Sequence, residues 1–250
     1  MQYQKKKKVF STKILPNLPV IIDNIGLVLM LTQYDIDTLI ENPIAFVDGI
    51  LSAGQTDSFS SDYIQQAFIV LQKLGKEVSP QHFQQCIDIL ITKRNQKFIE
   101  YKQQLQVNNQ TFTSSPECLQ VMCYEDASLC ATGALVSVLS SDEHIQNTLG
   151  LLRSFVTEHL SSTPLTWARP PILQLRTFWL IERFSKILIK TLENKRFEQE
   201  ITYILEIVIN GALSVLLPSP QLKEFLDESN ANVAVTIQAA ALLERLLSLP

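Results

Sequence analysis

Residues 170–217 read PPILQLRTFWLIERFSKILIKTLENKRFEQEITYILEIVINGALSVLL, and their apolar residues recur at intervals of three and four. This spacing lines apolar side chains along one face of an α-helix. It predicts one helix over residues 170–193 and a second over residues 196–217. Pro170 suits a first helical turn, where its missing N–H costs no hydrogen bond, and Pro218 ends the second helix. We expect the two helices to form a central hairpin against which the neighbouring segments pack.

The remaining chain shows the same periodicity, together with residues that begin and end helices. Few stretches alternate apolar and polar residues at period two, and runs of β-branched residues bounded by glycine turns are absent. The sequence therefore predicts an all-α fold. Further helices are expected over residues 20–31, 35–39, 43–51, 61–74, 80–105, 118–140, 144–160, 222–226 and 233–247.

The predicted hairpins begin near residues 61, 124, 170 and 222, roughly 45–60 residues apart. This spacing resembles the two-helix period of HEAT and armadillo repeat proteins, although no signature residue recurs in register. The resemblance implies an irregular stack of helical hairpins. A compact helical bundle fits the same predicted helices.

The domain organisation follows from where the polar stretches lie. Residues 1–13 are polar and basic and are expected to form a flexible arm. Residues 14–250 are expected to form a single helical domain, with one candidate sub-boundary in the polar loop 106–116. Lys5, Lys6, Lys7 and Lys8 resemble a short nuclear-import signal, so we expect a nuclear or cytoplasmic protein, with the nucleus favoured. The same run is also typical of a solvated tail.

The composition gives no whole-chain signal for nucleic-acid binding, because the formal net charge is −4. The longest near-apolar stretch, residues 25–31, is too short to span a membrane. All seven glycines are isolated, so no phosphate-binding loop is present. The histidines and cysteines show no metal-binding spacing. The sequence therefore predicts no cofactor, no metal, no small-molecule ligand and no enzymatic activity. These histidines and cysteines are His82, His144, His159, Cys86, Cys118, Cys123 and Cys130.

Several residues nevertheless have a specific expected environment. His159 is expected near the end of a helix, where a protonated imidazole interacts favourably with the helix dipole. Glu125 and Asp126 are adjacent carboxylates at a predicted helix start, where negative charge is stabilising. Trp179 is expected in the core. Trp167, in the connector before Pro170, is either buried or an anchor for a partner.

The most suggestive pattern is a series of basic residues spaced by seven. Arg169, Arg176, Arg183 and Lys190 follow this spacing, and Lys186 lies between the last two. On a helix they form a positive stripe that rotates slowly about the axis. The stripe is either the solvated side of an amphipathic helix or a contact surface for an acidic partner or for phosphates.

We therefore expect a non-enzymatic scaffold or adaptor that binds a protein partner within a larger intracellular complex. Helical stacks without nucleotide, metal or nucleophile motifs usually act as binding surfaces. The alternative is a nucleic-acid-associated protein, of the DNA-repair or chromatin type, that uses Lys5–Lys8 and residues 169–196. A third alternative is a helical enzyme whose site is assembled from scattered residues.

Overall fold

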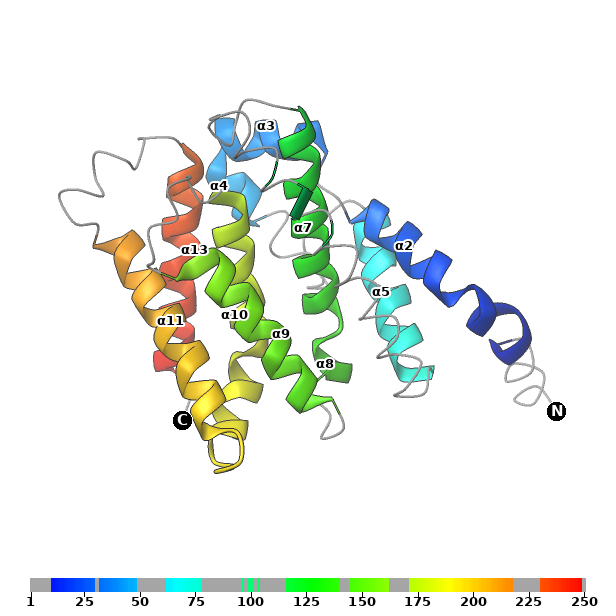
Figure 1. Cartoon of the computed structure of the whole chain (residues 1–250). Helices are drawn as coiled ribbons and strands as arrows, with labels where there is room; N and C mark the ends of the chain where they lie inside the picture. Colours follow the sequence, from blue (N-terminus) through cyan, green and yellow to red (C-terminus); the bar gives the residue numbers. More distant parts are fainter. Residues whose placement is uncertain are drawn as a thin grey trace.

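The computed structural model describes ten parts of the chain, and all regular secondary structure in them is helical (Figure 1), which confirms the all-α prediction. The described residues are 10–29, 32–48, 62–77, 96, 99–100, 103, 116–139, 144–161, 171–217 and 230–248. The elements are η1 (Phe10–Ile14), η2 (Leu15–Asn17), α2 (Leu18–Val28), α3 (Gln33–Glu41), α4 (Pro43–Phe46), α5 (Asp62–Glu77), α7 (Pro116–Ala134), α8 (Val136–Leu139), α9 (Ile145–Leu160), α10 (Pro171–Leu192), α11 (Glu198–Leu216) and α13 (Asn230–Leu247).

The long periodic helices begin and end close to their predicted bounds, and α10 and α11 reproduce the predicted pair. Helix α7 begins two residues before the predicted range 118–140, but the placement of Glu125 and Asp126 at a helix start is wrong. This helix begins at Pro116, which suits a first turn, so Glu125 and Asp126 lie in its middle rather than at its start. The predicted helix over 80–105, the loop 106–116 and the helix over 222–226 fall largely outside the described residues.

The N-terminal helices are short and are held by side-chain caps. The hydroxyl of Thr32 accepts a hydrogen bond from the Asp35 amide, and the Asp35 carboxylate accepts one from the Thr32 amide, which forms a capping box at the start of α3. The Asn42 side chain accepts a hydrogen bond from the Ala45 amide and caps α4, as its position before Pro43 predicts. Residues 10–13, assigned from the sequence to the flexible arm, form helical turns.

Helix α10 is the central element of the fold. It packs against α7, α9, α11 and α13 (Figure 1), and nearly all of its residues between Ile172 and Ile181 are buried. Helix α7 in turn packs against α2, α5 and α8. Helices α3 and α4 pack against α13, which brings residues 33–46 against the last described helix.

Helix α11 lies at the edge and buries only one side. Ile201, Ile204 and Val208 are fully buried, whereas Ile209 and Leu213 are exposed. Helix α10 therefore has the expected central position, whereas α11 does not. Among the described helices, α11 alone has the length and apolar composition of a membrane-spanning segment. Core helices of soluble proteins share this composition but are mostly buried, whereas 28% of this apolar segment is buried, on the side where α11 packs against α9, α10 and α13.

Candidate functional site

The structure divides the predicted basic stripe into buried and exposed residues. Lys186 and Lys190 are exposed on α10, and Arg183 is half-buried. Arg176 is only 1% exposed. The expectation of one continuous solvent-facing stripe is therefore wrong. Lys5–Lys8, Trp167 and Arg169 lie outside the described residues.

Arg176 is buried because a carboxylate from another helix pairs with it. Its Nε donates to Oδ1 of Asp126 on α7 at 2.8 Å, and its Nη2 donates to Oδ2 at 3.2 Å. Asp126 is itself fully buried. Burial raises the pKa of Asp126, and the Arg176 guanidinium opposes this shift. A two-point contact of this kind is among the strongest that an arginine forms, and it offsets part of the cost of removing both charges from water.

Trp179 lies between the two arginines of α10 and closes this part of the core. The guanidinium carbons of Arg176 and Arg183 are 5.1 Å and 5.4 Å from its ring centroid. Phe68 of α5 meets the ring edge-on, with ring centroids 6.5 Å apart. Arg183 also donates from Nε to the carbonyl oxygen of Gly133 at 3.0 Å. The prediction that Trp179 is a core residue is confirmed, and it links α5, α7 and α10.

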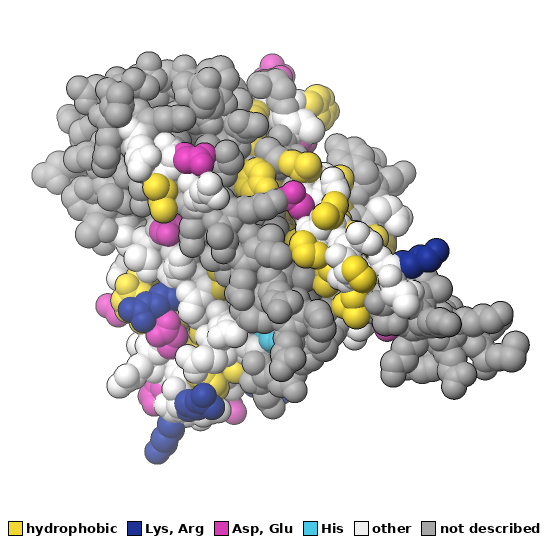
Figure 2. All heavy atoms as spheres, turned by 45° about the vertical axis from the view of Figure 1, so that its right-hand side comes forward, with side chains coloured by type: hydrophobic (Ala, Val, Ile, Leu, Met, Phe, Trp, Pro, Cys, Tyr) yellow, Lys and Arg dark blue, Asp and Glu magenta, His cyan; other side chains and the backbone are white. Residues whose placement is uncertain are grey.

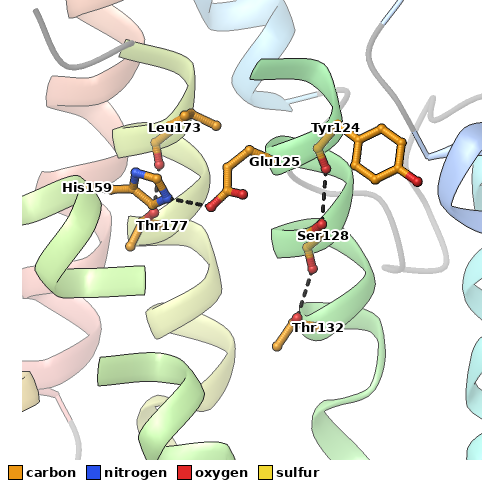
Figure 3. A network of polar contacts seen from close by, with 7 residues as sticks. All are labelled: Tyr124, Glu125, Ser128, Thr132, His159, Leu173 and Thr177. Carbon is orange, nitrogen blue, oxygen red and sulfur yellow. Dashed lines mark hydrogen bonds and ion pairs between the residues drawn. The ribbon is translucent and has the colours of Figure 1, made fainter. Parts of the chain in front are cut away.

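A second buried polar pair joins α7 to α9. His159 points toward the carboxylate of Glu125 (Figure 3), and His159 Nε2 and Glu125 Oε1 share a hydrogen bond of 2.9 Å. Both side chains are nearly inaccessible to solvent. His159 does lie in the last turn of α9, as expected, but its imidazole faces a buried carboxylate. Sequence reasoning missed this pair because its members are 34 residues apart.

The hydroxyl groups around these pairs bond to their own helices. Thr132 donates to the carbonyl oxygen of Ser128 at 2.8 Å, and Ser128 donates to that of Tyr124 at 3.1 Å. Thr177 on α10 donates to the carbonyl oxygen of Leu173 at 2.7 Å (Figure 3). These bonds satisfy hydroxyl groups that would otherwise be costly to bury.

Only one group of the described side chains could hold a metal ion. It consists of Glu125, Glu158 and His159, whose candidate ligand atoms all lie within 4.8 Å of one another. Cys123 and Cys130 are buried on α7, and burial raises the pKa of each thiol to about 11. Both are therefore protonated at neutral pH, as expected of structural rather than reactive cysteines.

No family model matches this chain, and no curated protein or solved structure is detectably similar to it.

Proposed function

We propose that the protein is a non-enzymatic helical scaffold that binds a protein partner through the outer apolar face of α2 and α5. The observation that carries this proposal is the exposure of five large hydrophobic side chains on two helices that pack side by side. They are Val20, Leu27 and Val28 of α2 and Ile69 and Val70 of α5.

The exposed apolar side chains of α2 are unusual for a helix at the edge of a fold. Val20 is 61% exposed and Leu27 is 53% exposed, although an edge helix normally turns polar residues to water. Figure 2 shows hydrophobic side chains gathered over this part of the surface. Contiguous apolar patches of this kind typically mark interaction sites.

The chemistry of the patch favours an amphipathic helix as the partner. Asp23 is the one charged residue of α2. The exposed positions of α2 are all uncharged, and Val20, Leu27 and Val28 among them are apolar, so this helix offers apolar contact rather than ion pairing. A partner helix with apolar residues at spacings of three and four would bury this face against its own. Binding through such contacts depends little on salt.

We infer a compact bundle rather than an open repeat for the architecture. In a stack of HEAT or armadillo repeats, each repeat contacts only its neighbours. The contact of α3 and α4 with α13 joins segments far apart in sequence, which supports a closed bundle with α7 and α10 at its centre. The partner would then bind an outer face and not a solenoid groove.

The test compares three versions of the full chain as bait in affinity purifications from source cells. One version carries Val20→Asp and Leu27→Asp, a second carries the single control change Leu213→Asp, and the third is the parent. Leu213 is 42% exposed on α11 and receives the same kind of charge at another face. We expect a partner that the α2 variant loses at least tenfold and that the α11 variant retains. Equal recovery by all three folded versions would contradict the proposal.

Nucleic-acid binding is the second candidate function. It is favoured by four exposed basic residues, Lys186 and Lys190 on α10 and Lys195 and Arg196 in the turn after it. Phosphate binding through these residues would weaken steeply with salt. Replacing Lys186 and Lys190 with glutamate should then flatten the salt dependence by up to about two units of slope. Binding to the α2 face should not change with this replacement.

A further inference from the structure

We propose that Glu125, Glu158 and His159 form a binding site for a divalent transition-metal ion, with Zn²⁺ the best match to their chemistry. The side chains come from two helices, Glu125 from α7 and the other two from the last turn of α9. An ion bound there would join α7 to α9 directly.

The distances are close to those that coordination requires. With metal–ligand distances of about 2.0–2.1 Å, neighbouring ligand atoms around a tetrahedral ion are about 3.3–3.4 Å apart. Nε2 of His159 and Oε1 of Glu125 are already 2.9 Å apart. The Glu158 oxygen lies within 4.8 Å of both, so side-chain rotation would bring all three atoms to coordination distance.

The set of donor atoms selects the type of metal. One imidazole nitrogen and two carboxylate oxygens suit zinc and neighbouring transition metals. Calcium takes six to eight oxygen ligands, and magnesium prefers an octahedral shell of oxygens, so both fit this set poorly. Water would complete a tetrahedral zinc site.

The electrostatics of the position also favour a cation. Two carboxylates, a neutral imidazole and a divalent ion form a unit without net charge, which lowers the free energy of burying it. The site lies at the C-terminal end of α9, where the helix dipole favours positive charge. Asp126 is held separately by Arg176 and is not available to the metal.

The experiment uses the full chain after removal of any affinity tag and treatment with a chelator. Calorimetric titration with Zn²⁺ should show one ion bound per chain. Glu158→Gln and His159→Gln should each weaken zinc binding at least tenfold. Glu206→Gln, an exposed carboxylate-to-amide change on α11, should leave binding unchanged.

One of these variants and one further measurement make the result decisive. Glu158 is only partly buried, so its variant should fold and remain interpretable even if His159→Gln does not. Co²⁺ should give the visible spectrum of a tetrahedral site without a thiolate-to-metal band, which excludes cysteine ligands. Absence of stoichiometric binding to the folded chain, parental affinity in Glu158→Gln, or a thiolate band would each overturn the proposal.

Discussion

Replacing Asp126 with asparagine tests whether Arg176 is a buried cation held by a single carboxylate. The amide has nearly the same shape, so the change removes charge without creating a cavity. Arg176 is 1% exposed and Asp126 is fully buried, and two hydrogen bonds of 2.8 Å and 3.2 Å join them. Breaking a buried pair in this way costs about 3–5 kcal/mol, because the remaining charge loses its partner.

A matched control exists on the surface of the same protein. Arg153 and Glu200 form an ion pair of 3.0 Å whose side chains are 50% and 27% exposed. Glu200→Gln makes the same carboxylate-to-amide change, and a pair this exposed contributes at most about 1 kcal/mol. Added salt should reduce the effect of Glu200→Gln much more than that of Asp126→Asn.

The assay is urea unfolding followed by circular dichroism, with thermal melting alongside. A loss of about 3–5 kcal/mol corresponds to a fall in melting temperature of about 6–20 °C for a chain of this size. The double variant Arg176→Met with Asp126→Leu should be more stable than Asp126→Asn, because it buries no unpaired charge. If Asp126→Asn loses no more stability than Glu200→Gln, Arg176 is not buried and paired as described.

Four further outcomes are expected. Trp179→Ala should lower the free energy of unfolding by about 3–5 kcal/mol. Gly133→Ala should lower it by about 1–3 kcal/mol, because its new Cβ would meet the Trp179 ring. Both losses are measured by urea unfolding, and parental stability would place the ring outside the core. The pKa of Cys130 is raised from 9.0 to about 11, so the folded state keeps a proton that the unfolded state has lost. The contribution of Cys130 to the free energy of unfolding should therefore be fully present below pH 9 and fall by about 1.4 kcal/mol per pH unit between pH 9 and pH 11. Parallel unfolding curves of the parent and Cys130→Ala measure this contribution. Lys186→Glu with Lys190→Glu should change stability by less than about 0.5 kcal/mol each, and a large loss would mean that these exposed residues have structural contacts.

The helices could be predicted from sequence where one face is buried and the other is exposed to solvent. Helix α10 shows this pattern clearly, and its predicted bounds differ by only one residue at each end from Pro171–Leu192. Helix α7 is buried on nearly every side from Met122 to Leu135, with Tyr124 the exception. Polar residues on such a helix do not mark a solvent face, so Glu125 and Asp126 were assigned to a helix start.

The residues of the candidate site could not be predicted, because their partners are remote in the chain. An arginine that belongs to a series of basic residues spaced by seven indicates a surface stripe, unless the carboxylate that pairs with it in the fold is known. Arg176 and Asp126 are separated by 50 residues. The same holds for the metal-binding proposal, because Glu158 and His159 alone show no ligand spacing until Glu125 is brought beside them.

The buried polar contacts of α7 explain why one arrangement of the central helices is favoured over others. Apolar side chains alone tolerate small rotations and shifts of one helix against another. Asp126 with Arg176, and Gly133 with Arg183, fix α7 against α10 at two points along its length. Sliding α7 by one turn would break both contacts and leave Arg176 buried without its carboxylate, at the cost estimated for Asp126→Asn. We therefore infer that these polar pairs act chiefly by excluding alternative helix registers, while the apolar core supplies most of the stability.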